Sequence, residues 1–212
     1  MLNKLINILI FLISYLLGSV PFSYIITKLF KGKDIRKLGT KNVGAMNVIS
    51  VAGLVPGLLA LFFDISKGAL AVYLTEKITG NSALTIFAGL FTVIGHNWPI
   101  FLKFNGGKGI ATTIGILLIK SPISFLILYL IVIPIAILIT NDSFISASIG
   151  FLIFPLILWL LKRDIWWVIF GILLAFIIVI RHVDELKTFF KGRRELHPIV
   201  QKIRDFILRK NN

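Results

Sequence analysis

The sequence predicts an all-α integral membrane protein with about seven transmembrane helices, an external N-terminus and a cytoplasmic C-terminus. The chain of 212 residues is 57% hydrophobic, has a mean hydropathy of +0.94 and contains only 15% charged residues. Soluble domains carry roughly 25% charged residues, because their surface must be solvated. Most of this surface must therefore face lipid.

Apolar stretches of spanning length recur along the whole chain. A transmembrane helix needs about 20 mostly apolar residues. The predicted spans are residues 5–27, 48–75, 83–102, 122–140, 143–161 and 165–180. The apolar run 110–119 has only ten residues and would cover about half a bilayer, at about 1.5 Å per residue.

Region 83–119 decides the number of crossings. Two crossings give seven helices, a re-entrant pair gives five, and both leave the C-terminal tail on the same side. With residues 28–47, 96–109, 141–142 and the tail from 181 inside, 17 of the 23 Lys and Arg are cytoplasmic. A single crossing would place the basic tail outside, against the positive-inside rule. We predict seven helices.

The net charge of +14 follows largely from this topology, so we predict no nucleic-acid partner. We expect one membrane domain, residues 1–182, and a basic amphipathic tail, residues 183–212. In the tail an apolar stripe lies at helical spacing between basic residues: Ile199, Ile203, Phe206 and Ile207. Such a helix lies on an anionic lipid surface.

A glycine-rich segment, Asn105 to Gly109, comes just before the apolar run from Ile110. Glycines let backbone N–H groups approach an anion closely, a helix N-terminus adds positive potential, and Lys108 adds a full charge. The segment does not fit the nucleotide P-loop pattern. It is a candidate phosphate-binding loop, and an ordinary helix start is the alternative.

Few other side chains indicate chemistry. Asp64 and Lys67 lie three residues apart within a predicted span, so they are a functional candidate that can also satisfy itself as an ion pair. His96 and His182 do not form a recognisable metal site, and the chain has no cysteine. We predict no metal and no cofactor.

Three segments together resemble a known family. They read GKDIRKLGTKNVGAMN at 32–47, DISKG at 64–68 and GHNWPIFLKFNGGKGIAT at 95–112. Their order and spacing are similar to those of the bacterial acyl-phosphate-dependent glycerol-3-phosphate acyltransferases. The resemblance runs from about residue 18 to residue 182.

The resemblance implies a seven-helix enzyme of the inner membrane with a cytoplasmic active face. It would transfer a fatty acyl group from acyl phosphate to the 1-hydroxyl of glycerol 3-phosphate, giving lysophosphatidic acid and phosphate. Its partners would be these two substrates and membrane lipids. The sequence makes no prediction of oligomeric state.

The resemblance also implies site residues. It assigns catalysis to Lys108, to Thr40 (where the family usually has serine) and to His182. The residues it implies for substrate binding are Gly106, Gly107, Gly109, Asn42, Asn47, Ser146, His96 and Asn97. Ser143 and Ser148 are alternatives to Ser146.

Three positions depart from the family pattern. Ser50 stands where an arginine is usual, and the last motif has Glu185 in place of asparagine and Thr188 in place of arginine. These changes should weaken anion binding unless nearby basic residues, namely Lys41, Lys187 or Arg181, compensate. A divergent paralogue with another phosphorylated acceptor is therefore an alternative function. A transporter of a phosphorylated metabolite is a second alternative, indicated by the intramembrane pair Asp64 and Lys67 and by Pro56-Gly57.

Overall fold

The computed structural model describes residues 2–161 and 163–192, and every regular element in that part of the chain is a helix. The chain divides into two compact units, residues 1–122 and 123–212. Each unit is described by itself. The predicted lipid-binding stripe around Ile203 lies outside the described residues.

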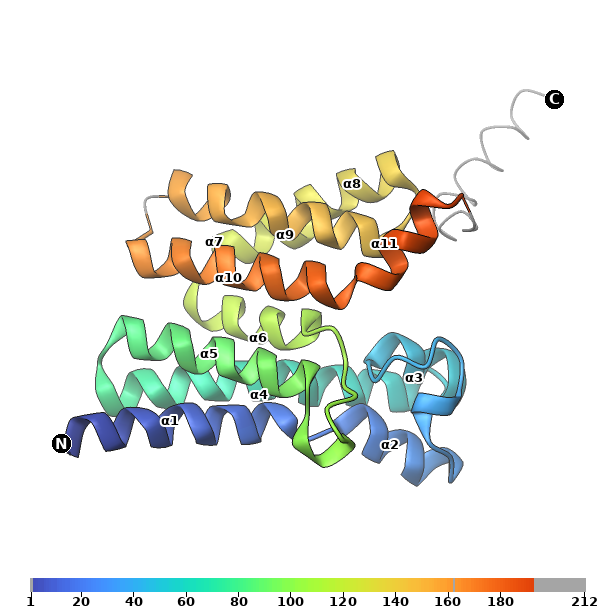
Figure 1. Ribbon diagram of the computed structural model, residues 1–212, viewed down its shortest axis with the longest axis horizontal. Helices are drawn as coiled ribbons and strands as arrows, with labels where there is room; N and C mark the ends of the chain where they lie inside the picture. The colour runs from blue at the N-terminus through green and yellow to red at the C-terminus, as the bar shows by residue number, and fades with distance from the viewer. Residues whose placement is uncertain (1, 162, 193–212) are drawn as a thin grey trace. The chain divides into compact units, whose positions relative to one another are not determined.

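The first unit is built on long helices that run side by side (Figure 1). Its elements are α1 (Leu2–Ser19), α2 (Phe22–Lys31), η1 (Ile35–Lys37), α3 (Ala45–Ala52), α4 (Leu54–Thr79), α5 (Ser82–Asn97), η2 (Ile100–Leu102) and α6 (Ile110–Lys120). The N-terminus and the α4–α5 turn lie at one end of this unit, while α2 and α3 lie at the other (Figure 1).

Two predicted spans are interrupted. The first was expected to continue to Thr27, but it breaks at Val20 and Pro21, because proline has no N–H and disfavours a helical residue before it. The second was expected from Val48 onward, but it breaks at Gly53, whose φ of 101° is outside the helical region. Both breaks lie at the end of the unit that carries the polar loops.

Helices of the first unit approach closely where glycine faces a neighbouring backbone. A Cβ at these glycines would collide with a carbonyl oxygen of the adjacent helix: Gly18 with Thr92, Gly95 with Tyr15, Gly68 with Thr112 and Gly115 with Ile65. The first two pairs join α1 to α5, and the other two join α4 to α6. Small residues at such crossings are typical of membrane helices, which pack by shape rather than by the hydrophobic effect.

Region 83–119 starts and finishes at the same end of the first unit. Lys120, at the end of α6, forms an ion pair of 2.6 Å with Glu76, near the end of α4. Because α5 begins directly after α4, both ends of the region lie at the same end of the unit. The region therefore leaves one end of the unit and returns to it, while α6, with 11 residues, is shorter than a full span.

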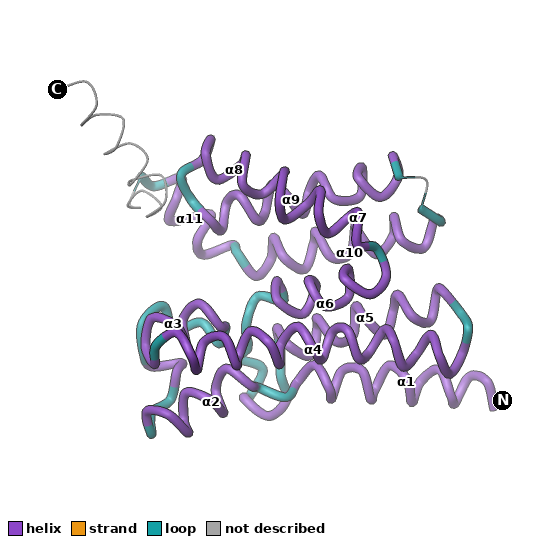
Figure 2. Tube along the Cα trace, turned by 180° about the vertical axis from the view of Figure 1, so that it is seen from behind, coloured by secondary structure: helices purple, strands orange, loops and turns teal. Residues whose placement is uncertain are grey.

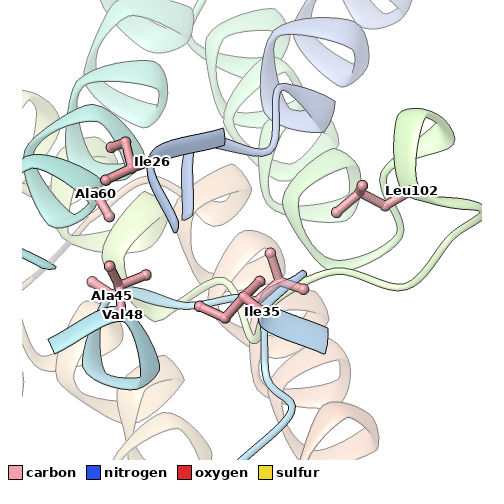
Figure 3. Packing of buried hydrophobic residues seen from close by; sticks show 7 residues of the cluster. Ile26, Ile35, Ala45, Val48, Ala60 and Leu102 are labelled. Atoms are coloured by element: carbon pink, nitrogen blue, oxygen red, sulfur yellow. The ribbon is translucent and has the colours of Figure 1, made fainter. Parts of the chain in front are cut away.

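A small apolar cluster fixes the polar end of the first unit (Figure 3). Its buried members come from α2, η1, α3, α4, η2 and the loop before α3: Ile26, Ile35, Val43, Ala45, Val48, Ala60 and Leu102. It holds loop 32–44 against the segment after α5. The two glycine-rich segments of the first unit are thus neighbours, as the predicted topology requires.

The second unit contains α7 (from Pro122 to Phe125), η3 (Leu126–Val132), α8 (Ile133–Thr140), α9 (Ser143–Leu160), α10 (Ile165–Arg181) and α11 (Val183–Phe190). Figure 2 shows α8, α9 and α10 as neighbouring helices. The η3 segment is a π-helix just before Pro134. Since Pro134 donates no backbone hydrogen bond, the preceding turn can widen at no further cost.

Five helical stretches in the described chain are long and apolar enough to cross a membrane, namely Lys4–Lys31, Leu54–Thr79, Ser82–Leu102, Pro122–Thr140 and Ser143–Leu160. The pair α10 and α11, bent by 61°, makes a sixth if it is one span. Each predicted span therefore corresponds to helical structure, and the chain is an all-helical membrane protein.

We expect Gly115→Val to destabilise the first unit by about 1–3 kcal/mol, because its side chain must push α6 away from the Ile65 carbonyl. Thermal unfolding of the purified protein in detergent measures this. Leu118→Ala is the control. Leu118 is an exposed residue of the same helix, so its side chain faces the apolar tails of the detergent and not another helix. Equal unfolding temperatures for the two variants would contradict the prediction.

Candidate active site

The predicted phosphate-binding loop, residues 105–109, lies against the last turn of α5. The Gly107 N–H donates to the His96 carbonyl oxygen at 3.0 Å. Gly109 has a φ of 79° and forms the N-cap of α6, and the Thr113 hydroxyl donates to its carbonyl oxygen at 2.9 Å. The loop is thereby anchored at both ends.

The glycines of this loop leave no room for side chains. A Cβ at Gly106 would meet the carbonyl oxygens of His96 and Asn97, and a Cβ at Gly107 would meet the His96 ring and the Val43 carbonyl oxygen. At Gly109 it would lie 2.8 Å from the Asn97 Oδ1 atom. The loop therefore packs directly between α5 and the loop that precedes α3.

Lys108 and Asn97 are both buried at this loop. The Lys108 side chain is 8% exposed, whereas Lys103 a few residues earlier is exposed. Asn97 is fully buried, and neither its Nδ2 nor its Oδ1 has a hydrogen-bond partner among the described residues. A buried amide without a partner is costly, so this one marks a place where a polar ligand would be stabilised.

Asn47 holds the conformation of loop 32–44 from the first turns of α3. Its Nδ2 donates to the carbonyl oxygens of Leu38 at 3.1 Å and Asn42 at 2.9 Å, and its Oδ1 accepts from the Thr40 N–H at 3.0 Å. Thr40 itself is exposed, while Asn47 is 3% exposed. Asn47 thus holds Thr40 and Asn42 in place from within the protein.

Arg36 connects the two polar segments of the first unit. Its guanidinium forms an ion pair of 2.6 Å with Asp34 and donates to the Leu102 carbonyl oxygen at 3.4 Å. It also lies over the Tyr24 ring, 5.4 Å from the centroid. The hydrogen bond from Arg36 keeps the pKa of Asp34 below its ordinary value, so this link is intact at neutral pH.

The predicted pairing of Asp64 with Lys67 is confirmed, with 2.7 Å between Lys67 Nζ and Asp64 Oδ1. The sequence did not indicate that other elements join this pair. The His96 Nδ1 atom lies 3.4 Å from Asp64 Oδ1, and the Ser23 hydroxyl donates to Asp64 Oδ2 at 3.3 Å. An adjacent cavity of about 10 Å³ offers roughly the room that one water molecule needs.

In the second unit, the start of α9 and the end of α10 come together. The ring centroids of Phe144 and His182 are 5.5 Å apart, and His182 is fully buried. The Ser146 hydroxyl donates to the Asp142 carbonyl oxygen at 2.5 Å and lies 2.8 Å from the Thr140 hydroxyl. Ser146 and Ser148 are buried, whereas Ser143 is half-buried.

Known proteins match this chain over nearly its whole length. A family model described as Glycerol-3-phosphate acyltransferase matches residues 8–192. The chain belongs to this family. The resemblance carried by the loop sequences is thereby confirmed.

Named members of the glycerol-3-phosphate acyltransferase family are close in sequence. Glycerol-3-phosphate acyltransferase 2 of Dehalococcoides mccartyi is 40% identical over 187 residues, which are 88% of this chain and 89% of that protein. Glycerol-3-phosphate acyltransferase of Carboxydothermus hydrogenoformans is 40% identical over 185 residues, which are 87% and 93% of the two chains.

A solved structure has the same fold. The crystal structure of PlsY, an integral membrane glycerol 3-phosphate acyltransferase, in its glycerol 3-phosphate form has a TM-score of 0.83 and 30% sequence identity. The match covers 93% of this chain and 98% of that one. A second form of the protein, with lysophosphatidic acid, has a TM-score of 0.80.

We expect Asn47→Ala to loosen loop 32–44, because three backbone groups lose their partner at once. At about 1 kcal/mol for each hydrogen bond, amide hydrogen exchange of residues 38–43 should accelerate by at least tenfold. Ser50→Ala is the matched control, since Ser50 is exposed on the same helix. Unchanged exchange in Asn47→Ala would show that the loop does not depend on this side chain.

Proposed function

We propose that this protein transfers a fatty acyl group from acyl phosphate to the 1-hydroxyl of glycerol 3-phosphate. The observation that carries the proposal is the buried Lys108 in a glycine loop at the start of α6, in a chain of the glycerol-3-phosphate acyltransferase family. That loop has the composition and close backbone packing of an anion site. The products would be lysophosphatidic acid and inorganic phosphate.

The reaction requires few chemical groups from the protein. The hydroxyl oxygen attacks the acyl carbonyl carbon, the bond from that carbon to the phosphate oxygen breaks, and the hydroxyl proton leaves with the phosphate. Acyl phosphate is already activated, so no protein nucleophile is required. The contribution of the site is then to position two substrates and to stabilise developing negative charge.

In this reaction Lys108 neutralises the phosphate of glycerol 3-phosphate, while the backbone of Gly106, Gly107 and Gly109 surrounds it. Thr40 and Asn42, held by Asn47, line the approach from loop 32–44. His96 and Asn97 pack directly against these three glycines.

The second unit contains two further residues that the family resemblance implies, Ser146 and His182. Their part rests on the family resemblance of the motifs that contain them. Ser50 and Glu185 stand where the family has arginine and asparagine, and Ser50 is exposed at α3. Lys41, which is exposed in loop 32–44, is our candidate for replacing the missing cation.

We further propose seven crossings, with α6 as a short one, an external N-terminus and a cytoplasmic C-terminus. The protein then lies in the plasma or inner membrane, with the loops around Lys108 open to cytosolic glycerol 3-phosphate and the acyl donor entering from the bilayer. In this topology the basic segment from residue 183 onward is cytoplasmic, as the positive-inside rule favours.

We expect Lys108→Ala to reduce acyl transfer about 100- to 1,000-fold, the effect of removing one charge-stabilising donor. Radiolabelled lysophosphatidic acid, formed by purified protein from glycerol 3-phosphate and acyl phosphate, is the measurement. Lys103→Ala is the matched control, because Lys103 is exposed in the same segment. Absence of product from the unaltered protein with either acyl phosphate or acyl-CoA would refute the proposed function, and solute uptake into liposomes without covalent change would favour a transporter.

We expect single cysteines at Lys103 and Lys191 to react with a membrane-impermeant thiol reagent only from the cytoplasmic side. A cysteine at Lys77 should react only from outside. The native chain has no cysteine, so each variant reports one position. Reaction of positions 103 and 191 from opposite sides would contradict the topology.

A further inference from the structure

The ion pair of Asp64 and Lys67 lies inside α4 with almost no exposure. Their side chains are 2% and 1% exposed. Two apolar side chains would fill the same space at lower cost, since burying charges carries a large desolvation penalty. Charges within a spanning helix therefore call for a role beyond packing.

The pair is a junction of several elements. Lys67 Nζ donates to the Val20 carbonyl oxygen at 3.2 Å, at the break between α1 and α2. Ser23 of α2 donates to the second carboxylate oxygen of Asp64. Asp64 Oδ1, which is 2.7 Å from the ammonium, also lies 3.4 Å from His96 Nδ1.

His96 connects this junction to the glycine loop. Its Nδ1 side faces Asp64 at 3.4 Å, and its Nε2 side faces Gly107 so closely that a Cβ there would collide with it. The carbonyl oxygen of the same residue accepts the Gly107 N–H. A carboxylate beside Nδ1 favours the form of the imidazole that carries a proton on that atom. The His96 ring therefore lies between the Asp64 carboxylate and the backbone of the glycine loop.

We propose that Asp64 is a positioning residue that acts on the phosphate-binding loop through His96. With Lys67 as its counter-ion, Asp64 orients the His96 ring, which supports Gly107 and keeps the backbone of residues 106–109 in the shape that accepts the phosphate of glycerol 3-phosphate. This inference rests on the proposed function for the identity of the anion. Its effect is specific: loss of Asp64 weakens binding of glycerol 3-phosphate more than it slows turnover.

The decisive variant removes both charges, Asp64→Leu with Lys67→Met, so that no unpaired ion is left in the membrane. We expect the KM for glycerol 3-phosphate to rise about tenfold, with kcat within about threefold of the unaltered protein. If the ion pair had only a structural role, the charge-removed variant would contain a smaller fraction of active protein, with an unchanged KM. The matched control is Glu76→Gln with Lys120→Met, which removes the ion pair between α4 and α6 far from the loop and should leave KM unchanged.

A double-mutant cycle tests whether His96 is the intermediary. His96→Ala alone, and His96→Ala added to the charge-removed variant, should both give the same rise in KM of about tenfold, because each removes the same support. A combined rise of about 100-fold would mean that the residues act independently, and it would overturn the inference.

A second measurement does not depend on catalysis. Amide hydrogen exchange of residues 106–109 should accelerate in the charge-removed variant and remain unchanged in the Glu76 and Lys120 control. Unchanged exchange at the loop overturns the inference even if no product is ever formed. If the unaltered protein makes lysophosphatidic acid while KM and exchange are unaffected, only the role of Asp64 fails and the proposed function stands.

Discussion

Close approach of helix backbones is the constraint on which the first unit depends. Lipid provides no hydrophobic force between apolar helices, so they are held by contact and by polar groups at short range. Gly18 and Gly95 allow α1 to lie on α5, and Gly68 and Gly115 allow α6 to lie on α4. This spacing brings the ends of α5 and α6 to the polar side chains of α4. The site depends on these contacts.

Much of the fold could be predicted from hydropathy and charge alone. Each apolar run forms helix because an unpaired backbone cannot exist in hydrocarbon, and the length of the runs carries that information directly. The prediction failed at Pro21 and Gly53, where a single residue interrupts an otherwise apolar run. Averaging hydropathy over a span conceals such breaks, although proline and glycine are visible in the sequence as signals for them.

Local features of the candidate site were also predictable, whereas its long-range contacts were not. The glycine loop before α6 and the pairing of Asp64 with Lys67 follow from residues close in sequence. The contact of His96 with Asp64 joins two helices, and it depends on how these helices cross. The bonds from Asn47 to loop 32–44 depend on a turn whose shape no periodicity encodes.

The level of the glycine loop along α4 has a chemical consequence. Asp64 contacts His96, which packs against the glycine loop. It is ten residues after the start of α4, a distance of about 15 Å along the helix axis. Lys108 and Asp64 are both buried by the surrounding helices, and in such a place the effective dielectric constant falls, so an ammonium attracts an anion more strongly than it would at a surface. In the proposed reaction, such shielding would also protect an activated acyl donor from hydrolysis, because it limits the access of water.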